Sequence, residues 1–280
     1  MWRFLRILLV LSAPYFPLAS TAALAQKAAS SEGFRWNGFY LGVYAGQAWA
    51  ESDIRTDAGA ASPDTYFTAA NEITSINRLA SGSIGPDELI AGMQIGANVQ
   101  TGKFVFGLEA DFGSFNLNSV RGGSYLVPNP LNPPQFAVAT VGATISTDWL
   151  LTARGRIGWT PSSNLLIYAT GGLAVTELRV SNSYADDSPF LGVGGASTSK
   201  MLFGWALGGG AEWALTRHWS LKAEYMHIDF GSVSTRGSVN CGPASTFFSD
   251  CVQFVVPSPL TTSADLSADI ARVGLNYKFD

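Results

Sequence analysis

The strongest constraint on this fold is a strict alternation of residue types along the segments that follow residue 35. In the last segment, residues 271–279, apolar side chains fill every second position, and glycine, amide and charged side chains fill the others. Because side chains alternate across a β-strand, such a segment predicts a strand with two different faces. Glycine shares the charged face, and small side chains suit the crowded inside of a narrow barrel. We therefore expect the apolar face to point outward, into lipid.

Eight segments show this alternation. Three of the seven links between them are short, and four are long and rich in Ser, Thr, Gly, Asn and Pro. Short and long links alternate strictly, so an up-and-down barrel would carry all the long links at one end. The expected strands cover residues 38–49, 89–100, 104–115, 147–160, 165–180, 201–215, 219–233 and 267–279, and the long links cover 51–88, 116–146, 181–200 and 234–266.

The fold class expected from this pattern is all-β. It is an eight-stranded antiparallel up-and-down transmembrane β-barrel with short periplasmic turns and four long extracellular loops. A short helix over residues 71–79 is expected inside the first long loop.

The main alternative is a soluble barrel, such as a lipocalin, with its apolar face inside. Only 14% of the residues are charged, whereas soluble domains carry about 25%. Aromatic residues also gather at the strand ends on the short-turn side, as in the girdle of a membrane barrel. These residues are Trp36, Phe39, Tyr40, Phe104, Trp159, Trp213, Trp219, Tyr277 and Phe279. The net charge of −4 gives no reason to expect a nucleic-acid partner.

The N-terminal segment has the features of a signal peptide. Arg3 and Arg6 precede an apolar run, and Ala23-Leu24-Ala25 is an A-x-A cleavage site. A membrane anchor is the alternative, but the run is short and interrupted by proline. We expect a signal peptide over residues 1–25, a short periplasmic segment over 26–35 and an outer-membrane β-barrel over 36–280. The mature protein would then lie in the outer membrane of a Gram-negative bacterium.

The alternation places a balanced set of charges inside the barrel. Four acids and four bases share the inward face, namely Glu109, Asp111, Glu212 and Glu224 with Arg154, Arg156, Lys222 and Arg272. Buried charges are costly unless they are paired, and a balanced set can pair in full. We interpret this lumen as a plug held by salt bridges. The alternative is a narrow ion path through the same charges.

The two cysteines, Cys241 and Cys251, both lie in the last long link. In an exported protein they predict a disulfide that closes this loop, and a metal or redox pair is the alternative. The two histidines, His218 and His227, are too few to suggest a metal site. We expect no cofactor, no metal and no catalytic residue.

Four motifs resemble those of the opacity-type "porin family" surface proteins of alphaproteobacteria. They are Trp36-Asn37-Gly38-Phe39-Tyr40-Leu41-Gly42, Gly208-Gly209-Gly210-Ala211-Glu212-Trp213, Leu221-Lys222-Ala223-Glu224-Tyr225 and the closing segment from Arg272 to Phe279. The resemblance implies an eight-stranded outer-membrane barrel that is a structural surface protein, antigen or adhesin; some related proteins bind haemin. It also implies that Tyr277 and Phe279 form a C-terminal signal read by the barrel-assembly machinery, although Asp280 follows them here.

Other partners expected from this resemblance are outer-membrane lipids, lipopolysaccharide and a host or envelope ligand at the loops. The expected function is therefore a non-enzymatic surface protein that displays loops for adhesion or ligand binding. A small porin is the alternative. A third hypothesis rests on His218-Trp219-Ser220, with Glu224 nearby, which resembles part of the site of an outer-membrane lipid A deacylase. His218 is expected at a periplasmic turn, far from lipid A in the outer leaflet.

Overall fold

The computed structural model describes residues 34–128, 135–245, 249, 253 and 255–279. The expected signal peptide, residues 1–25, and most of the expected periplasmic segment lie outside these residues. The described part contains the helix α1 and eleven strands. They are β1 (Gly38–Asp57), α1 (Ala70–Leu79), β2 (Gly82–Ile84), β3 (Asp87–Thr101), β4 (Phe104–Ser114), β5 (Asn118–Pro128), β6 (Phe136–Ser146), β7 (Trp149–Ser162), β8 (Leu165–Asp186), β9 (Val193–Ala214), β10 (Trp219–Asn240) and β11 (Ser258–Lys278).

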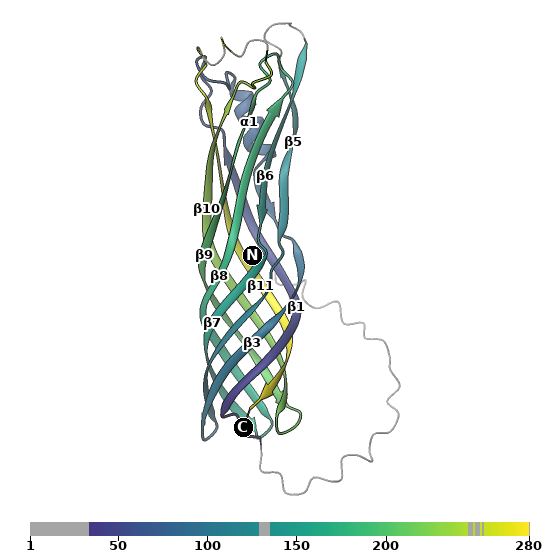
Figure 1. Ribbon diagram of the computed structural model, residues 1–280, viewed down its shortest axis with the longest axis vertical. Helices are drawn as coiled ribbons and strands as arrows, with labels where there is room; N and C mark the ends of the chain where they lie inside the picture. Colours follow the sequence, from purple (N-terminus) through teal and green to yellow (C-terminus); the bar gives the residue numbers. More distant parts are fainter. Residues whose placement is uncertain (1–33, 129–134, 246–248, 250–252, 254, 280) are drawn as a thin grey trace, which may run out of the picture. The chain divides into compact units, whose positions relative to one another are not determined.

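The long strands pair in a run that returns to its start. The order is β1, β3, β4, β7, β8, β9, β10 and β11, and β11 pairs with β1 through contacts such as Leu41 opposite Tyr277. Every pair in this run is antiparallel, and the strands cross the long axis at a tilt (Figure 1). The expected all-β, antiparallel, barrel-like fold is thus confirmed.

The described residues form eleven strands where eight were expected. The additional strands β2, β5 and β6 lie inside segments expected to be long loops. β5 and β6 pair with each other as a hairpin, and β6 pairs with the far end of β8. Strands β8, β9 and β10 each extend over 22 residues, well past their expected ends. The helix expected over residues 71–79 is confirmed as α1, and no helix among the described residues could span a membrane.

Strand β11 shows why the expected strands were too short. From Ala271 to Tyr277 its odd-numbered side chains are apolar and face outward; Val273 is 53% exposed. From Pro259 to Asp269 the outward side chains are mostly polar, whereas the inward ones, such as Leu260 and Leu266, are apolar and buried. The two faces of the same strand therefore exchange character near Ile270. An outward apolar face suits lipid and an outward polar face suits water.

This exchange divides the described strands and their links into two parts. The lower part comprises residues 38–49, 89–114, 149–175, 201–227 and 271–279, and the upper part comprises 50–88, 115–128, 135–148, 176–200, 228–245 and 255–270. Exposed aromatic side chains mark both ends of the apolar outer belt, as in a membrane barrel. Phe39, Phe104, Trp159, Trp213 and Trp219 mark the end near the short turns, and Trp49, Phe112, Phe203, Trp205 and Tyr225 mark the other end.

Two members of the expected girdle lie elsewhere. Trp36 is 2% exposed, and Tyr40 is 3% exposed because its side chain points into the lower part. The expectation for Tyr40 was wrong because it counted aromatic residues by their position along the strand and ignored which face they occupy.

The upper part has an apolar interior. Helix α1 contributes Ile76 to this core, which also contains Phe67, and both side chains are fully buried. Strands β6 and β8 contribute Ile145 and Leu178 to the same core. Figure 1 shows α1 among the strands at this end. This core reaches into the top of the lower part through Ile90, Leu150 and Met226. Nearer the short turns the interior becomes polar and charged, so two interiors of opposite character follow one another along the strands.

Candidate functional site

The charged interior of the lower part is the first candidate site. Eight ionisable side chains point into it from five strands, and none is more than 4% exposed. They are Glu109 and Asp111 on β4, Arg154 and Arg156 on β7, Glu212 on β9, Lys222 and Glu224 on β10, and Arg272 on β11. The structure brings together all eight residues expected from the alternation.

Arg154 lies at the centre of this cluster. Its Nη2 donates to Glu109 Oε1 at 2.7 Å and to Asp111 Oδ2 at 2.8 Å. Its Nη1 donates to Glu224 Oε1 at 3.0 Å, and its Nε donates to Thr152 Oγ1 at 3.0 Å. One guanidinium thus joins carboxylates from β4 and β10, which do not pair with each other as strands. The contact crosses the lumen and fixes the distance between opposite walls.

Two further bases complete the centre. Lys222 Nζ donates to Glu109 Oε1 at 2.8 Å and Oε2 at 2.9 Å. Arg272 donates through Nε to Glu224 Oε1 at 2.8 Å and through Nη2 to Asp111 Oδ2 at 3.0 Å. Charge-assisted hydrogen bonds of this kind are stronger than neutral ones. The three bases therefore hold the same three carboxylates from different sides.

Arg156 and Glu212 extend the cluster toward the short turns. Arg156 Nη2 donates to Glu212 Oε2 at 2.8 Å. The other oxygen of Glu212 accepts from Ser220 Oγ at 2.5 Å and from Asn276 Nδ2 at 2.9 Å. Each of the eight charged side chains consequently has an opposite charge within about 3.0 Å.

Three tyrosines that were not expected at the site surround the cluster. Tyr40 donates to Glu109 Oε2 and Tyr168 donates to Glu224 Oε2, each at 2.7 Å. The guanidinium carbon of Arg272 lies 4.4 Å from the ring centre of Tyr44, a cation–π distance. The sequence did carry a signal, because Tyr40 and Tyr44 occupy the glycine face of β1.

Glycines on neighbouring strands make room for these rings. A Cβ at Gly96 would overlap the Tyr40 ring, and one at Gly92 would overlap Tyr44. Gly210 faces Tyr168 in the same way. The glycines therefore share the charged face because tyrosine rings lie directly over them.

The cluster is suited to filling space and joining strands. Its acids and bases are equal in number and neutralise each other at short distance, so the interior is closely packed and cross-linked. Among the described residues, no group of His, Cys, Asp and Glu side chains is arranged to hold a metal ion.

The deacylase hypothesis is not supported by the positions of its residues. His218 stacks on Tyr277 with ring centres 5.6 Å apart, and Tyr277 faces outward. Ser220 faces inward, is 3% exposed and donates its hydroxyl hydrogen to Glu212. The histidine and the serine thus lie on opposite faces of the wall and cannot act on one substrate.

The second histidine, His227, lies on the outer surface near the boundary between the two parts. Its Nδ1 lies 2.9 Å from Asp269 Oδ1, which also accepts from the Tyr225 hydroxyl at 2.8 Å. The Trp205 ring lies 5.4 Å from the imidazole. His227 therefore contacts Asp269 on the neighbouring strand β11.

The remaining expected residues lie near the chain's C-terminal third. Cys241 is 4% exposed, but Cys251 lies outside the described residues, so their disulfide stays a prediction. The rings of Tyr277 and Phe279 lie 5.2 Å apart on the outer surface, and Phe279 N donates to Phe39 O at 2.9 Å. The residues of the proposed assembly signal thus close the wall against β1.

Comparison with known proteins places this chain among outer-membrane barrel proteins. The family model "Outer membrane protein beta-barrel domain" matches residues 16–279. The chain is 29% identical over 257 residues to the "31 kDa outer-membrane immunogenic protein" of Brucella melitensis, covering 91% of this chain and 88% of that protein. It is 23% identical over 287 residues to the "25 kDa outer-membrane immunogenic protein" of Brucella abortus, covering 99% and 100%.

A similarity to solved structures is weaker. The "outer membrane protein OprG from Pseudomonas aeruginosa" aligns with 13% identity and a TM-score of 0.44, covering 88% of this chain and 98% of that one.

Proposed function

Because this chain belongs to the outer-membrane β-barrel family and resides in the outer membrane of Gram-negative bacteria, we propose that it is a structural surface protein. Eight strands, β1, β3, β4, β7, β8, β9, β10 and β11, cross the membrane through the lower part. The short turns face the periplasm and the upper part faces outward. In this proposal the four long extracellular loops are built largely from the folded strands of the upper part, which they display for adhesion or ligand binding.

The outer belt supports this orientation and depth. On β11 the outward apolar stretch covers residues 271–279, close to the roughly 9–11 residues that a tilted transmembrane strand needs. Long connections of membrane barrels lie outside the cell and short ones in the periplasm. Lipids and lipopolysaccharide are therefore the proposed partners of the belt, and the barrel-assembly machinery that of the C-terminal strand.

The charged cluster is the observation that favours a structural protein over a porin. Eight paired charges and three tyrosines fill the lower lumen, and Arg154 links opposite walls. We propose that this cluster is a plug and that the barrel conducts no ions. A small porin is the second candidate, since mobile charges in the same lumen could pass ions.

A non-enzymatic role is supported by two observations. The curated relatives named above are described as immunogenic outer-membrane proteins. His218 and Ser220, the two residues of the deacylase hypothesis, lie on opposite faces of the wall.

Planar-bilayer recording tests the plug directly. We expect purified protein to show no unitary conductance, and reconstitution into liposomes with protease protection would demonstrate insertion in the same preparation. Discrete channel openings by inserted protein would instead establish the porin alternative.

Orientation is tested separately with an epitope tag after Leu191 and another after Arg217. Antibody should reach only the first tag on intact cells.

A further inference from the structure

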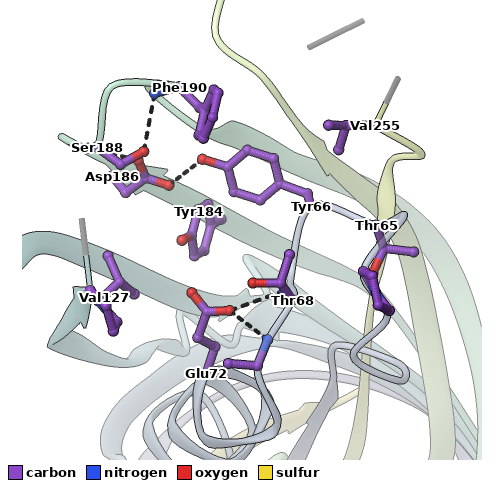
Figure 2. Close-up of a pocket in the computed structure, with 13 residues that line it drawn as sticks. Thr65, Tyr66, Thr68, Glu72, Val127, Tyr184, Asp186, Ser188, Phe190 and Val255 are labelled. Carbon is purple, nitrogen blue, oxygen red and sulfur yellow. Dashed lines mark hydrogen bonds between the residues drawn. The ribbon is translucent and has the colours of Figure 1, made fainter. Parts of the chain in front are cut away.

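The upper part contains a cavity of about 340 Å³ at its open end. The cavity lies between the segment that precedes α1, the end of β5 and the end of β8 (Figure 2). Its volume falls within the range of small-molecule sites, which begins near 300 Å³. This cavity is separate from the charged cluster of the lower part, because the apolar core of the upper part lies between them.

Aromatic rings form one wall of the cavity. Tyr66 and Tyr184 line it with their ring centres 6.2 Å apart and their planes at 76°. Phe67 packs edge-on against both rings from behind, at 5.8 Å and 5.1 Å. The two tyrosine rings are thus held in place at the cavity wall by the core.

Two carboxylates accompany these rings. Asp186 accepts from the Tyr66 hydroxyl at 2.6 Å and from the backbone N–H groups of Ser188 and Gly192 at 2.9 Å and 3.1 Å. Glu72 in α1 uses Oε2 to accept from the backbone N–H groups of Thr68 and Ala69. In Figure 2 the Glu72 carboxyl points toward Tyr184.

No basic side chain lines the cavity among the described residues. All thirteen lining residues belong to the described part of the chain, and none is Lys, Arg or His. Burial raises the pKa of the Glu72 carboxyl, and the charge of Asp186 raises it further. The cavity therefore combines negative charge with aromatic surface, and a cation would relieve the repulsion between the two carboxylates.

We propose that this cavity binds a small organic cation whose ammonium group carries alkyl substituents. Cations of this type are recognised by aromatic rings, which attract them through their negative faces, and by nearby carboxylates. The Tyr66 and Tyr184 rings would contact the alkyl groups, and Glu72 and Asp186 would supply the charge.

The inference adds a ligand class to the display role proposed above, and it rests on that role only for access from outside the cell. Calorimetric titration of the purified full-length mature protein in detergent tests the site itself. The probe is choline, and the matched control is 3,3-dimethylbutan-1-ol, which has the same shape without the charge. We expect choline to bind at least about tenfold more tightly than the neutral alcohol.

Variants locate the binding. Glu72→Gln keeps an oxygen acceptor for the helix N–H groups but removes the charge, and it should weaken choline binding at least about tenfold. Tyr184→Leu removes a ring and should weaken binding as well. Asp265→Asn removes an exposed charge on the outside of β11 and should leave the affinity unchanged. Retained heat-dependent migration in gels shows that each variant is folded.

Three results would overturn the proposal. These are no saturable binding at millimolar choline, equal affinity for the neutral alcohol, and wild-type affinity in both Glu72→Gln and Tyr184→Leu. A silent bilayer recording together with absent choline binding would reject this site and leave the structural role intact. Channel openings together with choline binding would support this site and reject the non-conducting structural role.

Discussion

Arg154 is the residue on which the charged cluster most depends. Its guanidinium contacts three carboxylates from two strands, and its side chain is fully buried. Lys222 and Arg272 each neutralise part of the same set, but neither contacts all of Glu109, Asp111 and Glu224 at hydrogen-bond distance. Removal of Arg154 would therefore leave negative charge in the lumen that the remaining bases cannot balance.

We expect Arg154→Ala to lower the free energy of unfolding by about 3–5 kcal/mol, the usual cost of an unpaired buried charge. Urea-induced unfolding in detergent micelles, followed by tryptophan fluorescence, measures this change. Arg179→Ala is the matched control because Arg179 is exposed on the outer face of β8, where a substitution should cost less than about 0.5 kcal/mol. Equal stability of the two variants would refute the plug.

Gly96 tests the fit between glycines and tyrosines in the lumen. A Cβ at this position would overlap the ring and hydroxyl of Tyr40, which is itself hydrogen-bonded to Glu109. Gly96→Ala should therefore destabilise the protein by about 1–3 kcal/mol, as overpacking in a core does. Gly155→Ala is the control, since its Cβ would meet only an ordinary contact at 3.9 Å. The same unfolding measurement compares the two, and a harmless Gly96→Ala would contradict the packing described.

At the scale of elements, a single strand crosses two environments. The outward side chains of β11 are apolar from Ala271 onward and mostly polar before it, while its inward side chains change in the opposite sense. The strand is continuous through the change, so its pairing with β1 and β10 persists on both sides. We therefore take the membrane boundary to lie where the apolar face of the strand changes from outward to inward.

This boundary predicts opposite outcomes for one substitution at two positions of β11. Leu275→Lys places a charge within the apolar belt and should cost about 2–4 kcal/mol, the cost of lysine near the bilayer midplane. Ser263→Lys places the same charge on the outer face of the upper part and should change stability by less than about 0.5 kcal/mol. Unfolding from lipid vesicles measures both. Similar losses at the two sites would contradict the boundary near Ile270.

The same elements show what sequence reasoning could predict and why the rest was missed. The alternation in the lower strands predicted their inward faces, and hence the positions of all eight charged residues. It failed for the upper extensions because their polar side chains face water, so the segments resemble loops. In β10 a register irregularity between Asp229 and Ser232 also interrupts the alternation. The pairing of β6 with β8 joins residues far apart in sequence, and no local pattern predicts it.

The tyrosines of the site illustrate a different limit. Tyrosine is apolar in its ring and polar at its hydroxyl, so its presence on a strand does not say which face is the interior. Tyr40 and Tyr44 could be assigned only from the glycines that share their face. The cavity near Glu72 could not be predicted at all, because it forms between segments separated by more than a hundred residues.

At the scale of the whole molecule, the described strands enclose two interiors, a charged one and an apolar one, which follow each other along the strand direction. The two are stabilised by different forces, ion pairs in the lower part and apolar burial in the upper part. The hairpin of β5 and β6 belongs only to the upper one, because it pairs with β8 beyond Glu177 and packs against α1. Its ends also lie close together, since Phe115 N donates to Asp148 O at 3.1 Å.

Replacement of residues 116–147 by a two-residue Asn-Gly turn should therefore separate the two interiors. Strand β4 would keep its pairing with β7, including Ser114 opposite Trp149, and the charged cluster would remain complete. We expect this variant to insert into liposomes and to keep its heat-dependent migration in gels. Choline binding should be lost, because Val127 and the support for α1 are removed. A variant that no longer folds would show instead that the lower part depends on the apolar core above it, so that the two interiors form one cooperative unit.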